Sequence, residues 1–147
     1  MEKQMNFEED GFFDCPFFNV NRLARVMNKM AEEEFALIGL SPSYAYLLMV
    51  VEQNPGITQK DLSETLHIAP STSTRFIDKL VSKGLVQRKS EGKLALIYPT
   101  DKGLQLHKEI NRCWQRLNER FADIVGSEQG SMLSGMMHAV SEKVEKK

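Results

Sequence analysis

Residues 57–100 constrain the fold more than any other part of the chain. Their apolar residues recur first at helical spacing and then in two short runs around a polar stretch, which indicates two short helices followed by a β-hairpin. The predicted order is a helix after Thr58, a turn at 67–70, a helix from Pro70 to Lys83, and strands at 85–88 and 94–98 around a tip at 89–93. This order predicts a mainly α chain with a small β-hairpin wing.

Residues that mark helix ends support this assignment. Thr58, with Asp61 three positions later, resembles a capping box in which the hydroxyl accepts a hydrogen bond from the later backbone N–H. Pro70 suits the first turn of a helix because an N–H at that position would have no partner, and Gly84 is a C-terminal stop signal. Two helices joined by a tight turn and followed by a hairpin form a winged helix-turn-helix.

The second of these helices has two different faces. Ser73, Ile77 and Leu80 fall on one stripe and are expected to face the interior. The opposite face carries Ser71, Thr72, Arg75 and Lys79. In a major groove, hydroxyls near a helix N-terminus reach phosphates or base edges, a guanidinium matches the paired acceptors of guanine, and an ammonium suits a phosphate. The pattern predicts double-stranded DNA as a partner.

Positive charge is concentrated over the same stretch. From Arg75 to Lys93 there are six basic residues against two acidic ones, a local net charge of +4 in a chain whose net charge is −1. Such a surface can bind a polyanion, and the alternative is a solvated charged face. The candidate DNA-binding residues are Thr58, Gln59, Ser71, Thr72, Thr74, Arg75, Lys79, Arg88, Lys89 and Lys93.

The string from Leu66 to Val86 resembles the MarR family of bacterial transcriptional regulators, and the resemblance covers nearly the whole chain. The family pattern is Ser-Thr-x-Thr-Arg, then Asp-(Lys/Arg)-Leu and Lys-Gly-Leu, with Thr-x-x-Gly after the wing. The matching residues are Ser71, Thr72, Thr74, Arg75, Asp78, Lys79, Leu80, Lys83, Gly84, Leu85, Thr100 and Gly103. The resemblance implies intertwined terminal helices in a dimer and control by a small ligand.

Two features depart from the family pattern. Ser73 stands where the family has an apolar residue, which weakens the packing of the recognition helix. The wing is shorter and lacks the family's Asp-Arg-Arg segment, so the arginine expected to probe the minor groove has no counterpart. Lys89 and Lys93 remain as substitutes, but a lysine is a point charge and not a planar fork. Contact between the wing and DNA is therefore an open question.

The segment before the winged helix-turn-helix is rich in phenylalanine. Four of these residues fall within positions 11–18: Phe12, Phe13, Phe17 and Phe18. They are expected to pack on a subunit interface, on a pocket wall or on the chain's own core. Asn19 or Asn21 then leads into an amphipathic helix that ends at Gly39, and a further helix begins at Ser41-Pro42.

The part after the hairpin is predicted to be helical. Thr100 caps a helix of 24 residues, which at about 1.5 Å per residue spans roughly 36 Å. Ser127 or Ser131 begins a last amphipathic helix. A single domain of this size does not need such lengths for its own core, so the apolar stripes are expected to face a second copy. We predict one domain, 1–147, with a dimerisation region at 1–40 and 101–147 and the winged helix-turn-helix at 41–100.

Further candidate sites carry less support. Phe17, Tyr44 and Trp114 are aromatic candidates for a pocket that takes a small apolar or aromatic effector, although ordinary core packing explains the same residues. Cys15 is a candidate redox switch, because some members of the resembled family sense peroxides through a lone N-terminal cysteine whose thiolate is supported by tyrosine hydroxyls. Tyr44 and Tyr46 are the candidates for that support here. The opposing interpretation is a buried small hydrophobic residue. No His or Cys pair has metal-ligand spacing, so no metal or other cofactor is predicted.

The remaining patterns narrow the class of protein. The chain has no P-loop, nucleophile elbow or zinc-protease motif, which argues against an enzyme. No run approaches about 18 apolar residues and the N-terminus is acidic, so a cytoplasmic protein without a membrane partner is expected. The sequence predicts a ligand-relieved homodimeric repressor. Two alternatives stay open: a redox-sensing repressor acting through Cys15, and a winged-helix protein-interaction module with weakened DNA reading.

Overall fold

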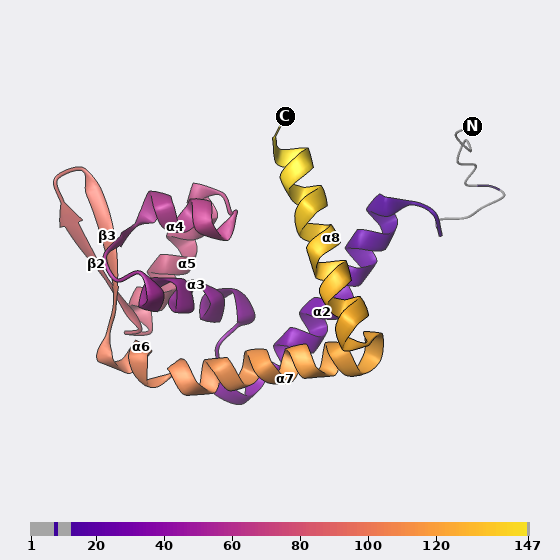
Figure 1. Cartoon of the computed structure of the whole chain (residues 1–147). Helices are drawn as coiled ribbons and strands as arrows, with labels where there is room; N and C mark the ends of the chain where they lie inside the picture. Colours follow the sequence, from indigo (N-terminus) through magenta and orange to yellow (C-terminus); the bar gives the residue numbers. More distant parts are fainter. Residues whose placement is uncertain (1–7, 9–12, 147) are drawn as a thin grey trace.

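The computed structural model of this chain describes residue 8 and residues 13–146. Its elements are α2 (Pro16–Phe35), η1 (Ala36–Ile38), α3 (Pro42–Gln53), β1 (Ile57–Thr58), α4 (Gln59–Leu66), α5 (Pro70–Ser82), β2 (Val86–Glu91), β3 (Leu94–Pro99), α6 (Asp101–Gln105), α7 (His107–Val125) and α8 (Ser127–Glu145). The elements α3 to β3, here called the winged unit, lie above one half of α7, and α2 and α8 project from its other half (Figure 1). The mainly α fold with a small antiparallel wing is confirmed.

The helix ends predicted within the winged unit are present. The Thr58 side chain accepts a hydrogen bond from the Asp61 backbone N–H at 3.1 Å. His67 ends α4 with a left-handed backbone, φ 53°, and α5 begins at Pro70 as predicted. Gly84 follows α5 with φ 73°, a conformation that glycine adopts without steric cost. These ends define α4 and α5 as a helix-turn-helix pair.

The wing belongs to a three-stranded antiparallel sheet in the order β1-β3-β2. The sequence did not predict β1, which has only two residues and pairs Ile57 with Ile97. The predicted tip at 89–93 is also wrong, because β2 continues to Glu91 and only Gly92 and Lys93 form the turn. Gly92 has φ 60°, as the first position of a type II′ hairpin turn requires. The two strands of the wing are therefore paired right up to the turn.

Apolar side chains from every element close the core of the winged unit. The largest fully buried ones there are Leu47, Leu48, Leu62, Ile77, Leu80 and Ile97. Phe35 at the end of α2 and Cys113 on α7 join the same cluster, which connects the terminal helices to the winged unit. Ser73 is fully buried, on the inward stripe as predicted, and its hydroxyl has no hydrogen-bond partner within the described residues.

Helix α2 begins earlier than predicted. Its first residue is Pro16, and not a residue after Asn19 or Asn21. The preference of proline for the first turn, which identified the start of α5, accounts for this start as well. The helix runs through η1 and ends at Gly39, which has φ 66°. The predicted end is therefore confirmed, and the predicted start is wrong.

The phenylalanines of the N-terminal segment divide into three groups. Phe12 lies outside the described residues. Phe13 and Phe17 are 83% and 77% exposed, and Phe18 is 39% exposed. For the three described residues, packing on the chain's own core is wrong. A subunit interface and a pocket wall stay as the two predictions for these side chains.

The helix predicted after Thr100 is divided in two. Thr100 caps α6 by accepting a hydrogen bond from the Gly103 N–H at 3.0 Å, but the helix breaks at Leu106 and α7 begins at His107. The Nδ1 atom of His107 lies 2.7 Å from a carboxylate oxygen of Glu52, whose side chain is only 5% exposed. Because this contact holds the start of α7 against α3, a straight continuation of α6 is not available.

Helix α6 is fixed to the winged unit on its other side. The Thr100 hydroxyl donates to the Gly84 carbonyl at 2.6 Å, and the Lys102 ammonium donates to the Lys83 carbonyl at 3.0 Å. A Cβ atom at Gly103 would lie 2.2 Å from the Leu85 carbonyl oxygen, so only glycine permits this approach of helix and strand. The junction between the winged unit and α7 is therefore closely fitted.

A group of ion pairs joins α2 to α7. The Glu34 carboxylate accepts from Arg116 Nε at 2.9 Å and from Arg120 Nη1 at 3.1 Å, and Arg120 also pairs with Glu33 at 3.0 Å. The hydrogen bond from Arg116 is the main reason why the pKa of Glu34 lies below its ordinary value. Burial raises the pKa of the neighbouring Cys113 thiol, which agrees with the predicted place of this residue in the core.

The outer parts of α2, α7 and α8 leave apolar side chains uncovered. On α8, four of them are each more than half exposed: Met132, Met136, Val140 and Val144. Val20 on α2 and Ile124 on α7 are 54% and 74% exposed. Within the described residues, no single helix is long and apolar enough to cross a membrane, and only the bent pair Pro16–Ile38 and Pro42–Gln53 meets that test of length and composition when taken together.

Candidate nucleic-acid interface

Helix α5 presents the predicted hydroxyl and basic residues to solvent. Ser71, Thr74, Arg75 and Lys79 are exposed and Thr72 is half-buried. On the opposite side, the stripe that contains Ile77 is fully buried, so the helix cannot rotate about its axis without exposing core residues. The Arg75 guanidinium lies 5.7 Å from the centre of the Phe76 ring, a distance at which a cation and an aromatic ring attract each other. The outward face of α5 therefore has a fixed orientation.

Gln59 and Thr74 are linked across the helix-turn-helix. The Gln59 amide donates to the Thr74 hydroxyl at 2.6 Å, and that hydroxyl donates to the Pro70 carbonyl at 3.0 Å. The only donor of Thr74 is thus used within the protein, whereas Gln59 keeps its side-chain carbonyl and a second amide hydrogen. Of these two predicted DNA-binding residues, Thr74 positions Gln59, and Gln59 carries the groups that can meet a base edge.

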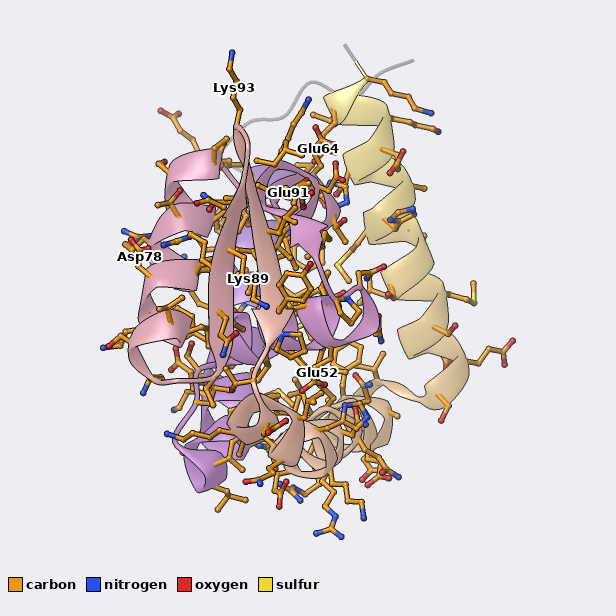
Figure 2. The ribbon with its side chains drawn as sticks, turned by 90° about the vertical axis from the view of Figure 1, so that its left-hand side faces the viewer. Glu52, Glu64, Asp78, Lys89, Glu91 and Lys93 are labelled. Carbon is orange, nitrogen blue, oxygen red and sulfur yellow. The ribbon has the colours of Figure 1, made fainter. Side chains whose placement is uncertain are left out.

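The three basic residues of the wing, Arg88, Lys89 and Lys93, occupy different positions, and Figure 2 labels the two lysines. Arg88 Nη2 donates to Asp78 Oδ1 at 2.6 Å, which ties β2 to α5. The Lys89 ammonium lies 4.9 Å from the centre of the Tyr98 ring. Lys93 is in the turn at the end of the hairpin. The pairing between Asp78 and Arg88 was not predicted, because no local spacing rule connects a helix residue with a strand residue ten positions later.

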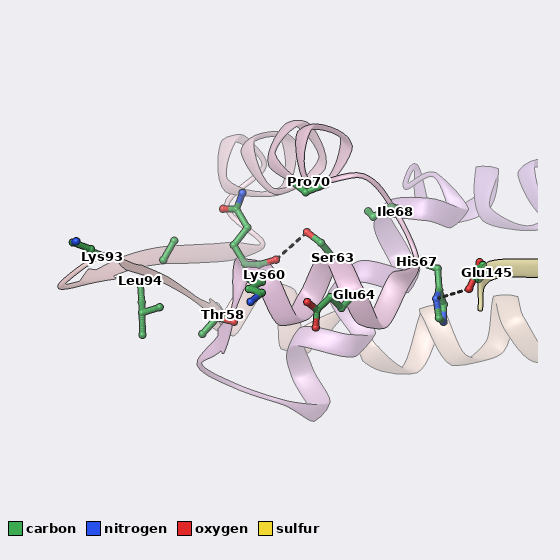
Figure 3. Close-up of a pocket in the computed structure, with 12 residues that line it drawn as sticks. Thr58, Lys60, Ser63, Glu64, His67, Ile68, Pro70, Lys93, Leu94 and Glu145 are labelled. Carbon is green, nitrogen blue, oxygen red and sulfur yellow. Dashed lines mark hydrogen bonds and ion pairs between the residues drawn. The ribbon is translucent and has the colours of Figure 1, made fainter. Parts of the chain in front are cut away.

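An open groove of about 770 Å³ lies between α4 and the wing (Figure 3). Its lining includes Thr58, Lys60 and Lys93, so the capped start of α4 and the end of the hairpin border the same space. Glu145 of α8 borders the groove as well, and its carboxylate lies 3.9 Å from Nδ1 of His67. The end of α8 therefore lies beside the turn that precedes α5.

A second cavity, of about 340 Å³ and also open to solvent, is lined by residues of α2, α3, α4, α5 and α7. Of the three aromatic candidates for a pocket, Trp114 lines it, whereas Tyr44 packs edge-on against Phe76 and Phe17 is exposed in the first turn of α2. Tyr46 and Phe76 line the cavity and were not predicted. The indole N–H of Trp114 is buried and has no hydrogen-bond partner in the described part of the chain.

Cys15 is at the N-cap of α2 and is half-buried, so the interpretation as a buried hydrophobic residue is wrong. The aromatic rings of Tyr44 and Tyr46 contact Phe76 and Trp114, and no hydrogen bond between either tyrosine and Cys15 occurs among the described residues. Over the same residues, no group of three or more His, Cys, Asp or Glu side chains is placed to hold a metal ion.

The packed helix-turn-helix, the fixed outward face of α5 and the adjoining hairpin define a winged helix-turn-helix protein. Residues 38–93 match a family model described as MarR family. The chain is 28% identical over 131 residues to the HTH-type transcriptional regulator YybA of Bacillus subtilis (strain 168), over 86% of this chain and 87% of YybA. It is 30% identical over 94 residues to YwoH of the same organism, over 63% and 69% of the two chains. The chain belongs to the MarR family of transcriptional regulators.

Solved structures share the fold over most of the chain. One is a putative MarR family regulator from Listeria monocytogenes complexed with a 26mer DNA, 27% identical, with a TM-score of 0.72 over 87% of each chain. Another is the PcaV regulator from Streptomyces coelicolor in complex with its natural ligand, 19% identical, with a TM-score of 0.76 over 96% of this chain and 98% of PcaV. Members of this family regulate transcription and are not enzymes.

Proposed function

We propose that this protein is a homodimeric repressor that binds a near-palindromic operator through α5 and leaves it when a small apolar or aromatic ligand binds. The observation that carries the proposal is the outward face of α5, because its hydroxyl and basic residues are exposed while the opposite stripe is fully buried. Such a helix enters a major groove with its register set by the protein core.

The residues divide into base-reading and phosphate-contacting groups. Arg75 has the paired donors that fit guanine, and Gln59 keeps the groups that fit adenine. Ser71, Thr72 and the first N–H groups of α5 lie where a helix N-terminus meets a phosphate. Lys79 and Lys93 carry point charges that suit phosphates. Sequence specificity would then come from the first of these groups and register from the second.

The exposed apolar faces of α2, α7 and α8 support a dimer. The α8 stripe from Met132 to Val144 and the exposed Phe13 and Phe17 are surfaces that a second copy would bury. A two-fold axis through these helices would place two α5 helices about one DNA turn apart, roughly 34 Å. A symmetric dimer of this kind requires a near-palindromic operator.

The cavity of about 340 Å³ supports ligand control. It lies where α2 and α7 meet the winged unit, and its lining of Tyr46, Phe76 and Trp114 suits an aromatic or apolar molecule. The unpaired indole N–H of Trp114 would give such a ligand one polar contact. A ligand that binds more tightly to a dimer with the wrong half-site separation shifts the population away from DNA.

The proposal is tested by fluorescence anisotropy of the purified protein on DNA from upstream of its own gene and on a scrambled duplex, over a range of salt. We expect a preference of about 10³-fold or more for its own DNA and a steep loss of affinity with salt. Arg75→Ala should remove about 1–3 kcal/mol of this discrimination. Arg112→Ala, an exposed arginine of α7, is the matched control and should leave it unchanged.

Equal and weak binding to both duplexes and to duplexes selected from a random pool would contradict the proposal. The winged unit would then serve a protein partner. If Arg75→Ala still discriminated between the two duplexes, the base-reading role would not lie in α5. If the dimer bound DNA equally well with and without an apolar or aromatic ligand in the cavity, only the ligand part of the proposal would be contradicted.

A further inference from the structure

We infer that the wing of this protein rests on the phosphate backbone through Lys93 and does not read the minor groove, so that sequence specificity lies in α4 and α5. This inference rests on the proposed function and assigns its recognition mode. Reading of the minor groove is favoured by a long tip, which gives reach, and by a free arginine, whose planar guanidinium is less strongly hydrated than an ammonium. The hairpin offers neither among its described residues.

The tip is short and rigid. Strand pairing continues to the last pair, Glu91 opposite Leu94, and leaves only Gly92 and Lys93 as the turn. A two-residue turn has no length with which to reach beyond the strands. The hairpin therefore meets DNA as a fixed edge whose outermost cation is Lys93 (Figure 2).

The only arginine in the hairpin is held elsewhere. Arg88 donates to Asp78 of α5 at 2.6 Å, and its register position opposite Ile97 places it on the hairpin face that turns toward the core. Releasing the guanidinium for DNA would break this charge-assisted hydrogen bond and free the wing from α5. Arg88 is thus a positioning residue, which sets the angle between wing and recognition helix.

The remaining cations are unsuited to a narrow groove. Lys89 lies over the Tyr98 ring at 4.9 Å, on the opposite face of the hairpin from Arg88 because side chains alternate along a strand. Lys93 has Glu91 two residues away in the same exposed tip. A narrow minor groove concentrates negative potential, so it repels this carboxylate, whereas a lysine on the groove edge can meet a phosphate and keep part of its hydration.

The probe is a duplex that the wild-type protein selects from a random pool. In variants of this duplex, the base pairs that flank the half-sites and lie under the wings are changed. Replacing flanking G·C pairs with inosine·cytosine removes the minor-groove amino group and leaves the major groove unchanged. We expect the affinity of the wild type to change by less than threefold. Lys93→Gln should lower the slope of log affinity against log salt by about 0.9 per wing, or about 1.8 per dimer, and weaken binding equally on every flank.

Two controls separate charge from position. Lys93→Arg keeps the charge and should keep the salt slope. Lys108→Gln removes an exposed charge on α7, a helix that runs below the winged unit in Figure 1, and should leave the slope unchanged. A threefold or larger dependence on the flanking minor groove, or an unchanged slope in Lys93→Gln, would overturn the inference while the selected operator still upholds the proposed function. Failure of the wild type to select any sequence would overturn both.

Discussion

The winged unit buries its apolar residues, whereas the terminal helices leave many of theirs exposed. In the winged unit, the apolar residues of α3, α4, α5 and the sheet meet in one buried core. On α8, the residues of the apolar stripe from Met132 to Val144 are each more than half exposed, and Gly130 is the only residue of that helix that is fully buried among those described. The core of the first region is complete within one chain, whereas the second leaves an apolar face that the proposed dimer would cover.

Under the proposed function, this difference would give the two regions different tasks. A region with a closed core holds α5 in one orientation, which recognition of base edges requires. A region with uncovered apolar faces can change its contacts with a partner at a smaller cost, which control of half-site separation requires. The closely fitted junction at α6 joins the two regions, and the ion pairs of Glu34 hold α2 to α7 within the second one.

The largest effect is expected when charges are placed on the exposed apolar stripe of α8. The double variant Met136→Glu with Val140→Glu should raise the dissociation constant of the dimer by about a thousandfold or more, roughly 4 kcal/mol, because buried unpaired charges are costly. Sedimentation equilibrium measures the change. The winged unit should stay folded, and Ser141→Glu on the flank of the same helix should remain a dimer. An unchanged dissociation constant in the double variant would place the subunit interface elsewhere.

The junction between the regions is the next most sensitive place. Gly103→Ala should lower the free energy of unfolding by about 1–3 kcal/mol, because its Cβ would lie 2.2 Å from the Leu85 carbonyl oxygen. Chemical denaturation measures this change. The control is Gly135→Ala in α8, where a Cβ meets nothing within 4 Å and the higher helix propensity of alanine should stabilise by up to about 1 kcal/mol. Equal effects at the two glycines would show that the approach of α6 to Leu85 is relaxed.

One polar residue in the core of the winged unit, Ser73, can be replaced to increase the free energy of unfolding. Ser73→Ala removes a buried hydroxyl that has no partner among the described residues and should raise the free energy of unfolding by about 1 kcal/mol. Ser63→Ala is the matched control, because the Ser63 hydroxyl donates to the Gln59 carbonyl at 3.0 Å and its removal should give a smaller gain. A loss of stability in Ser73→Ala, measured by the same denaturation, would mean that the hydroxyl has a partner such as water.

The contact between α2 and α7 should respond to acid. The folded-state pKa of Glu34 is lowered from 4.5, chiefly by the hydrogen bond from Arg116. A lowered pKa means that the stabilisation is fully present above the unfolded value and is lost as the pH falls through the folded value. The difference in Tm between the wild type and Glu34→Gln should therefore be constant near neutral pH and shrink below about pH 4.5. A constant difference down to about pH 3 would contradict this assignment.

The smallest effect is expected at Cys15. It is half-buried at the N-cap of α2, and the described contacts of the two tyrosines lead to Phe76 and Trp114. Cys15→Ser should change DNA affinity by less than twofold, with or without peroxide. Anisotropy on the selected operator measures this change. Release of DNA by peroxide in the wild type, and its absence in the variant, would establish the redox alternative.

Local signals in the sequence were sufficient for much of the winged unit. The start of α4 follows from Thr58 and Asp61, that of α5 from Pro70, and the buried stripe of α5 from helical spacing. Each of these features depends on residues within about four positions of one another, where backbone geometry alone decides which groups meet. The same rule applied to Pro16 would have given the start of α2.

Pairings between distant residues could not be found in this way. The break at Leu106 depends on His107 meeting Glu52, and the position of the wing depends on Arg88 meeting Asp78. The cavity takes Tyr46 and Phe76 from different helices. Such contacts arise only when the packing of whole elements brings their side chains together, and no spacing in the sequence encodes them.

The sequence by itself determined the resemblance to the family, through the motif from Leu66 to Val86, and the order α4, α5 and hairpin. It also determined the exposed face of α5, because that face follows from short-range patterns of charge, polarity and capping. The tertiary structure decided which of the exposed residues remain available to a partner. Thr74 and Arg88 are both polar residues on the candidate interface, and both are engaged inside the protein. Availability is a property of the packed molecule, since a donor that has found a partner in the fold no longer offers that hydrogen to DNA.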